Sequence, residues 1–280
     1  MLLTVNIQNA IHHFLRDYTA ELIRYFLFAG ISFLILYVLG RQFFTRFKIQ
    51  QKFPASKHMW CELGYSLLSL VIFACNGVLV FACYRHGMTK LYLDIHAHSW
   101  GYFIFTVLAF IVAHDFYFYW THRFMHWKKV YPYIHKIHHL SHDPTPWAAY
   151  AFHPAEAVIQ AAIFPIMVFI LPVHPLAILV WGLYQTFLNV MGHSGFEFFP
   201  SGFTTHKITK LHNSSTHHNV HHKYATGNYG LYFNFWDRVM GTNHVKYTET
   251  FEQVKANTND MRKARKQEAV TEYQSVADAR

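Results

Sequence analysis

The sequence predicts an all-α protein: a multi-pass transmembrane helical bundle of about three spans plus a helical hairpin, with a cytosolic helical cap that carries a histidine-ligated di-metal site. Three observations predict this fold class. Of 280 residues, 52% are hydrophobic and only 14% are charged, which is poor in charge for a soluble domain. The apolar residues gather in blocks of about the roughly 20 residues that a membrane-spanning helix needs. Most of the 23 histidines fall between His114 and His222.

Three long apolar blocks come first, and each is long enough to span a membrane. They cover residues 22–39, 63–84 and 102–120. Two shorter blocks, 157–171 and 176–191, are joined by a turn with a proline at each end, Pro172 and Pro175. We therefore expect a helical hairpin that crosses the membrane or dips into it, with both ends on one side.

The basic residues predict the orientation. The chain carries 24 Lys and Arg against 15 Asp and Glu, a formal charge of +9, and the loop after the first block is rich in both basic types. Because short basic loops stay in the cytoplasm, the N-terminus and the loop near Lys90 lie outside, and segments 121–156 and 192–280 are cytoplasmic. This placement indicates that the basic residues interact with a membrane surface and not with nucleic acid.

The chain divides into N-terminal transmembrane helices (1–99), a histidine-rich region (100–248) and a polar tail (249–280) expected to form a surface helix with a frayed end. The three cysteines form no CxxC pair and are expected to pack as small apolar residues. No cleaved signal peptide is expected, because the first apolar block begins only near residue 22.

The histidines are spaced for chelation. His122 and His126 are four residues apart on the helix that leaves the third block, so both imidazoles share one helical face. Two further clusters have the spacing HxxHH: His135, His138 and His139, and then His218, His221 and His222. In the predicted topology all three clusters share one compartment and supply eight ligands.

Eight imidazoles exceed the four ligands of a tetrahedral zinc site and imply two metals. A redox-active iron pair fits better than two structural zincs, because closed zinc sites usually employ cysteine and none lies near the clusters. A loose metal-buffering tract is the alternative, but such tracts are not usually set at helical intervals. The isolated histidines, expected to be bystanders, include His12, His58, His86 and His174.

At these positions the sequence resembles the fatty acid hydroxylase and sterol desaturase superfamily of membrane di-iron enzymes. The resemblance covers roughly residues 100–245 in the family's order and spacing. It rests on HRFMH (122–126), HKIHH (135–139), FHP (152–154), GHSG (192–195), HHNVHH (217–222), NYG (228–230) and WDRVMGT (236–242). One HxxxH pair would be a weak signal, whereas three boxes with the WDR signature are specific.

The resemblance implies two iron ions held by histidines alone, which zinc can replace in preparations. The implied ligands are His122, His126, His135, His138, His139, His193, His218, His221 and His222. His217 stays open as a ligand. Some members have a further ligand four residues before the position of His193, where this chain has Asn189.

Metal-bound imidazoles usually donate their second N–H to a carboxylate or carbonyl. Asp115 on the third block and Asp237 of WDR are the candidate acceptors, with a structural ion pair as the alternative for Asp115. His114, about 12 Å deeper than His122 by helical rise, is expected to line a substrate cavity. The aromatic run at 116–120 suits the wall of such a cavity or an interfacial belt equally well.

The implied function is a membrane-bound non-haem di-iron oxygenase that hydroxylates or desaturates a C–H bond of a lipid, a sterol or fatty acyl chain, with 100–248 as the catalytic domain. The alternatives are aldehyde deformylation or ether-lipid cleavage on the same scaffold, and a non-enzymatic membrane metal-binding protein. The stretch PTPWAAYAFHP resembles bacterial members, which implies the bacterial inner membrane, with the metal site on the cytoplasmic side.

The chain has no dinucleotide fingerprint, haem-attachment motif or iron–sulfur cysteines, so the electrons must come from another protein. We expect a ferredoxin or a small haem cytochrome with its reductase. An acidic donor would be steered by the basic residues Arg123, Lys128, Lys129 and Lys136. The alternative is that these residues contact anionic lipid headgroups.

Overall fold

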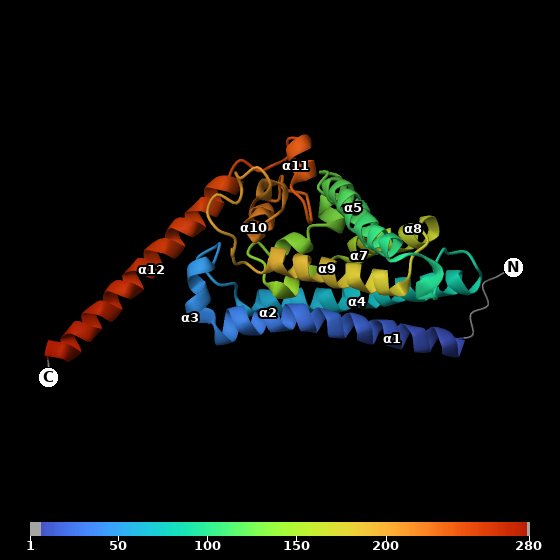
Figure 1. The fold of residues 1–280 in the computed structure, drawn as a ribbon, viewed down its shortest axis with the longest axis horizontal. Coiled ribbons are helices and arrows are strands. Elements are labelled where there is room, and N and C mark those ends of the chain that lie inside the picture. The colour runs from blue at the N-terminus through green and yellow to red at the C-terminus, as the bar shows by residue number, and fades with distance from the viewer. Residues whose placement is uncertain (1–6, 279–280) are drawn as a thin grey trace.

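The computed structural model describes residues 7–278, and within them the chain is helical with isolated bridges but no strand. The all-α prediction is confirmed. Four helical stretches are long and apolar enough to cross a membrane: Ile7–Leu39, Ser56–Arg85, Trp100–Met125 and Pro175–His193. The last three are α4, α5 and α9, and they lie beside one another in the body of the molecule (Figure 1).

The first stretch starts earlier than its apolar block. It begins at Ile7 with α1 (Ile7–Tyr25) and continues through π-helical turns and α2 (Ile31–Phe33) to Leu39, whereas the sequence predicts a span over 22–39. Charged residues in α1 do not end the helix, because they pair with one another: Arg16 with Asp17 at 2.8 Å, and Arg24 with Glu21. α1 packs mainly against α4 (Ser56–Arg85).

The predicted hairpin is present, with unequal arms. Its first arm is broken into α7 (Pro154–Ala161) and α8 (Ile163–Ile170), and its second is α9 (Pro175–His193). Proline occupies the first turn of both α7 and α9, where its missing N–H costs no helical hydrogen bond. Only α9 is long enough to cross a membrane.

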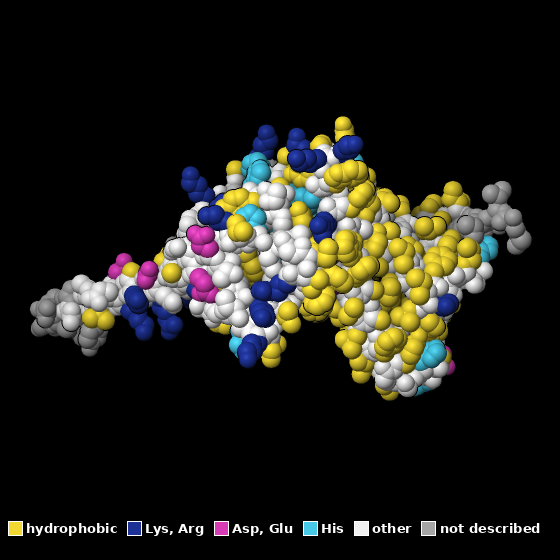
Figure 2. All heavy atoms as spheres, turned by 90° about the horizontal axis from the view of Figure 1, so that it is seen from above, with side chains coloured by type: hydrophobic (Ala, Val, Ile, Leu, Met, Phe, Trp, Pro, Cys, Tyr) yellow, Lys and Arg dark blue, Asp and Glu magenta, His cyan; other side chains and the backbone are white. Residues whose placement is uncertain are grey.

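The outer surface separates an apolar region from a charged one. Along α5 (Trp100–Met125), Ile104, Leu108 and Val112 recur every four residues and are exposed, so they form an outward apolar stripe. Figure 2 shows apolar side chains over one half of the molecule, with charged side chains gathered on the other half. This division is typical of an integral membrane protein with one end in water.

Short helices and loops cover the end of the bundle that carries the charge. They include α10 (Ser215–Tyr224), which packs against α9, and α11 (Phe235–Val239). The polar tail forms α12 (Tyr247–Asp278), whose Tyr247, Phe251 and Val254 are buried against the body before the helix continues away from it (Figure 1). The shorter connecting elements are α3 (Arg41–Phe44), α6 (Tyr131–Ile134) and 3-10 turns at Thr45–Phe47, Ile95–Ala97, His138–Leu140, Pro146–Tyr150 and Thr209–Leu211.

Candidate metal centre

Five separate elements deliver histidines to one place at the charged end of the bundle. His122 lies in the last turn of α5 and His126 caps its end, so the i,i+4 face predicted from sequence is retained. His135 caps α6, and His193 is the last residue of α9. The remaining members come from the turn His138–Leu140 and from α10: His138, His139, His218, His221 and His222.

All nine histidines predicted as ligands come together, in two groups. Within each group the ligand nitrogens lie within 4.8 Å of one another. The five-histidine group is His122, His126, His135, His139 and His221. The four-histidine group is His138, His193, His218 and His222. Each HxxHH cluster is thus divided between the groups, which spacing alone does not indicate.

The Nε2 atoms converge. In the five-histidine group, Nε2 of His122 and His135 are 3.0 Å apart, and Nε2 of His139 lies 3.1 Å from that of His135. In the four-histidine group, Nε2 of His193 and His218 are 2.9 Å apart. Metal–nitrogen bonds of about 2.1 Å place neighbouring ligand atoms roughly 3.0 to 3.4 Å apart. These spacings therefore fit ligands that share a cation.

The opposite ring nitrogens face backbone carbonyls. Nδ1 of His122 donates to the Tyr229 carbonyl at 2.9 Å, and Nδ1 of His221 donates to that of Gly227 at 2.7 Å. The same arrangement joins His222 to Ser141, His193 to Asn189 and His138 to Ala151. A proton on Nδ1 leaves a lone pair on Nε2, so converging lone pairs would repel one another without a cation between them.

One carboxylate supports the centre directly, and it is not one that the sequence predicted. Glu156, fully buried in the first turn of α7, lies 2.8 Å from Nδ1 of His135 through Oε1. The sequence offered one indication of this role, because Glu156 follows the FHP motif by two residues. Because a carboxylate accepting from Nδ1 fixes the tautomer and raises the basicity of Nε2, Glu156 orients His135 toward a metal.

Asp115 does not take the predicted position. Its Oδ1 accepts hydrogen bonds from the backbone N–H groups of Tyr232 and Phe233, at 2.9 and 3.1 Å. It lies seven residues before His122, about 10 Å lower along α5, which is beyond the reach of its short side chain. It anchors the chain after the NYG motif to α5 instead.

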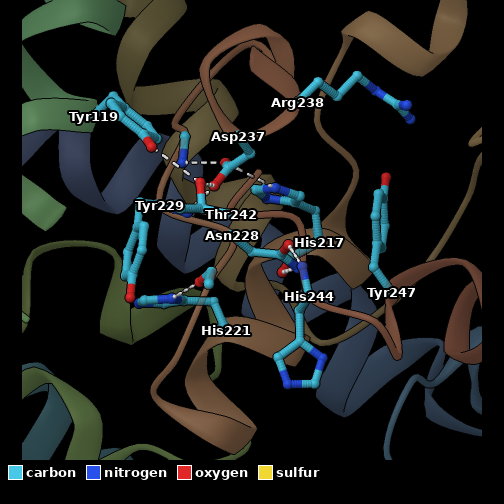
Figure 3. Close-up of polar contacts among 12 residues, drawn as sticks. Tyr119, His217, His221, Asn228, Tyr229, Asp237, Arg238, Thr242, His244 and Tyr247 are labelled. Atoms are coloured by element: carbon cyan, nitrogen blue, oxygen red, sulfur yellow. Dashed lines mark hydrogen bonds and ion pairs between the residues drawn. The ribbon is translucent and has the colours of Figure 1, made fainter. Parts of the chain in front are cut away.

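Asp237 supports the centre through the backbone. Its two oxygens accept from the N–H groups of Tyr229 and Gly230, at 2.9 and 2.7 Å, and from Thr242 Oγ1 at 2.7 Å. Figure 3 shows this carboxylate next to Thr242 and His217. The Tyr229 and Gly227 carbonyls, from the same part of the chain, accept from His122 and His221. Burial opposes the charge of Asp237, yet its hydrogen bonds and His217, 3.3 Å away, hold its pKa below the usual aspartate range.

Other candidate ligands stay outside the two groups. His217 is buried against Asp237 and the ring of Tyr247. Asn189, at the position of the questioned tenth ligand, donates its amide to the Ala149 carbonyl at 2.6 Å. Among the described residues, the isolated histidines at 12, 58, 86 and 174 belong to neither group.

Burial keeps the grouped imidazoles neutral. It lowers the pKa of His126 to about 2 and that of His135, His138 and His221 well below the ordinary value, and neighbouring imidazoles lower them further. Neutral imidazole is the form that binds metal. Protons therefore compete weakly for these nitrogens at neutral pH.

A cavity of about 620 Å³ lies within the bundle, close to the two histidine groups. Phe118 and Phe152 line it, and their rings lie 5.0 Å from His122 and 5.1 Å from His138. His114 also lines it. Of the aromatic run at 116–120, Phe118 lines this cavity while Phe116 and Trp120 are exposed on the outer surface.

Comparison with known proteins places this arrangement in a family. A sequence model of the fatty acid hydroxylase family matches residues 107–242, a range that contains all nine grouped histidines. The chain belongs to the fatty acid hydroxylase and sterol desaturase superfamily. The resemblance predicted from the histidine boxes is confirmed.

Its curated relatives carry sterol names. The chain is 35% identical to lathosterol oxidase of Rattus norvegicus over 196 residues, which cover 68% of this chain and 62% of that protein. It is 31% identical to a Delta(7)-sterol 5(6)-desaturase of Gibberella zeae over 163 residues (58% and 49%) and 29% identical to one of Schizosaccharomyces pombe over 233 residues (83% and 73%). The matched part thus spans less than two thirds of the first two of these proteins. No solved structure matches the chain.

Proposed function

We propose that the chain is a membrane oxidoreductase that hydroxylates or desaturates an unactivated C–H bond of a lipid, a sterol or a fatty acyl chain. The observation that carries the proposal is the convergence of nine neutral imidazoles beside an apolar cavity of lipid size. A metal carrier would need the imidazoles but not the cavity. The relatives named as sterol desaturases and lathosterol oxidases add support.

The nine histidines fit two iron ions. An all-imidazole donor set suits iron, copper, nickel and zinc, and two groups of five and four histidines allow one metal each. Two ferrous ions held there would supply electrons to dioxygen and so the power to oxidise a C–H bond. We assign the ligands to residues 100–248, with 1–99 contributing cavity wall and 249–280 lying outside the centre.

The chain's own residues hold and shield the site. Glu156 and the loop carbonyls accept from Nδ1 of His135, His122 and His221, so that Nε2 of these rings stays free for a metal. Phe118 and Phe152 present apolar rings to the cavity beside His122 and His138 and so keep water away from these two histidines. The cavity holds the lipid along α9, so that one carbon lies next to the histidines.

The test joins metal content to lipid analysis. Protein purified anaerobically with iron supplied should hold close to two metals per chain. Lipid extracts from cells with and without it should differ by an added oxygen or a lost pair of hydrogens, whereas aldehyde or ether cleavage would shorten the lipid. A well-folded protein with one metal or none would overturn the di-metal proposal.

The electron donor is proposed to be an acidic ferredoxin or a small haem cytochrome. Lys128, Lys129 and Lys136 are exposed on the segment that carries His126 and His135. Turnover driven by such a donor should fall steeply with salt, because surface charge steers association. Replacing all three lysines by Gln should remove that salt dependence.

We place the metal centre on the cytoplasmic side, and the bacterial inner membrane stays the expected location. Reporter fusions after Lys48, after Ser141 and at the C-terminus should all report the cytoplasm, and one near Lys90 the opposite side. Fusions after Ser141 and at the C-terminus on opposite sides would contradict the shared centre.

A further inference from the structure

The cavity beside the histidines contains charge in a place where apolar lining would suffice. It follows α9 from Pro175 to Asn189, about 21 Å by helical rise. Most of its lining is apolar. Part-way along, α1 contributes four charged lining residues: Arg16, Asp17, Glu21 and Arg24. Charged groups inside a membrane bundle are costly and mark functional sites by default.

Arg24 lines the cavity opposite a glycine of α9. A Cβ atom built on Gly182 of α9 would lie 2.9 Å from Nη1 of Arg24, so the glycine makes room for the guanidinium. Next to it, Tyr150 accepts a hydrogen bond from Gln185 Nε2 at 2.7 Å and lies 2.8 Å from Thr186 Oγ1. Polar groups from α1, α9 and Tyr150 therefore meet at one level of the cavity.

This polar cluster has capacity left for a ligand and no net charge. Arg24 pairs with Glu21, yet its buried Nε has no hydrogen-bond partner. Arg16 pairs with Asp17, so the two cations and two anions cancel. A carboxylate or phosphate entering here would be repelled by Glu21 and Asp17, whereas a hydroxyl can donate to a carboxylate and accept from a guanidinium.

We propose that Arg24 and Glu21, with Tyr150 and Gln185, bind the hydroxyl group of a neutral lipid such as a sterol or a long-chain alcohol. The proposal rests on the proposed lipid oxidation and adds the polar group by which the substrate is recognised. It also sets the position of reaction. Gln185 and Gly182 precede His193 by eight and eleven residues, about 12 to 16 Å along α9.

A lipid held by its hydroxyl at this level would present a carbon many bonds away to the histidines. For a sterol this is the side-chain end, not the ring next to the hydroxyl. The product of turnover should therefore carry its new oxygen or double bond far from the hydroxyl, which mass spectrometry of the product can locate.

Binding can be measured without turnover. The full-length, iron-loaded protein in detergent, kept anaerobic, is heated with increasing amounts of 5α-cholestan-3β-ol, 5α-cholestane, octadecan-1-ol, octadecane or octadecanoate. A bound ligand stabilises the protein by RT ln(1 + [L]/Kd), so the ligand concentration that gives a fixed rise in Tm compares affinities. The hydroxyl-bearing member of the sterol pair or the acyl pair should bind roughly tenfold or more tightly than its deoxy partner. The favoured pair identifies the source of the hydroxyl.

The matched variants remove one ion pair each without changing net charge. Glu21→Leu with Arg24→Met should abolish the preference for the hydroxyl while the deoxy lipid still binds. The control, Glu249→Leu with Lys246→Met, removes an exposed i,i+3 pair outside the cavity and should keep the preference. Should the first double variant fold poorly, Arg24→Lys in the intact cavity should weaken the preference, because a point charge replaces the guanidinium fork.

Equal affinities within both pairs, tighter binding of octadecanoate than of octadecan-1-ol, or a preference that survives the double variant would each overturn the hydroxyl site. Lipid oxidation in cell extracts could persist in all three cases, which would leave the proposed function intact. Conversely, hydroxyl preference without any oxidised lipid would support the site and overturn the oxidation.

Discussion

At the scale of single residues, helical geometry decides which histidines share a group. Pairs four residues apart stay together, as His218 and His222 do, because four residues return to nearly the same helical face. Adjacent histidines join different groups, as His221 and His222 do, because side chains of successive residues in a helix point about 100° apart around its axis. The adjacent pair in each HxxHH cluster therefore bridges the two groups.

Removing one imidazole should affect one group. His138→Ala takes one of four ligands and His221→Ala one of five, so each should lower metal content from two toward one per chain and abolish turnover. Metal analysis and lipid oxidation measure this. His86, exposed and in neither group, provides the control: if His86→Ala abolished oxidation as fully as His221→Ala in folded protein, the division of histidines would be wrong.

Glu156 should tune the five-histidine group alone. Glu156→Gln removes the charge that supports His135, and losses of such outer partners typically cost about 10 to 100-fold in metal affinity. Titration with a chelator should release one metal early while the second stays bound. Glu249→Gln, an exposed carboxylate, should leave both release steps unchanged. Simultaneous early release of both metals would contradict a local role for Glu156.

At the scale of elements, α9 contributes to the histidine groups and to the cavity from different turns of one helix. Its last residue, His193, joins the four-histidine group, and its preceding turns line the cavity. Gly182 keeps that lining open opposite Arg24. Metal binding and lipid binding thus depend on separate turns and should be separable by mutation.

Gly182→Phe should fill the cavity without disturbing the centre. The ring displaces Arg24 and occupies the path of the lipid, so turnover should fall at least about tenfold while metal content stays at two. Leu179→Phe adds a similar ring on an exposed position of the same helix and should retain turnover. Loss of metal in Gly182→Phe would show that the two contributions of α9 are not separate.

At the scale of the whole molecule, one ion pair joins the loop after the first span to two histidine clusters. Lys48, fully buried, lies 2.7 Å from Asp143, which follows His139 closely in sequence. Asp143 also accepts from Asn219, between His218 and Val220 on α10, at 3.4 Å. The loop after the first span therefore helps to hold α10 and the neighbouring loops on the charged end of the bundle.

Lys48→Met should destabilise the fold by about 3 to 5 kcal/mol, because it leaves Asp143 partly buried without its cation. Thermal unfolding in detergent measures this. Adding Asp143→Leu should recover part of the loss, since no unpaired charge remains. Lys52→Met, at an exposed position, should unfold like the parent protein. Equal Tm values for the Lys48 and Lys52 variants would exclude a structural role for the pair.

The sequence by itself determined the class of fold, the hairpin and eight of the nine histidines that converge, and the family resemblance added His193. Local periodicity carries that information: apolar blocks of membrane length predict helices, and i,i+4 spacing predicts shared faces. Sequence-based prediction fails where the hydrogen-bond partner of a side chain comes from a distant part of the chain. Asp115, close to the histidines in sequence, binds backbone N–H groups over a hundred residues away.

Only the tertiary structure decided the division into five and four histidines, the role of Glu156 and the polar cluster around Arg24. Arg16, Asp17 and Glu21 of α1 precede the apolar block, so the sequence predicted a span only from residue 22, but pairing within α1 and packing against α4 offset the cost of their burial. These features depend on which surfaces meet, and contacts between distant segments leave no period in a single sequence.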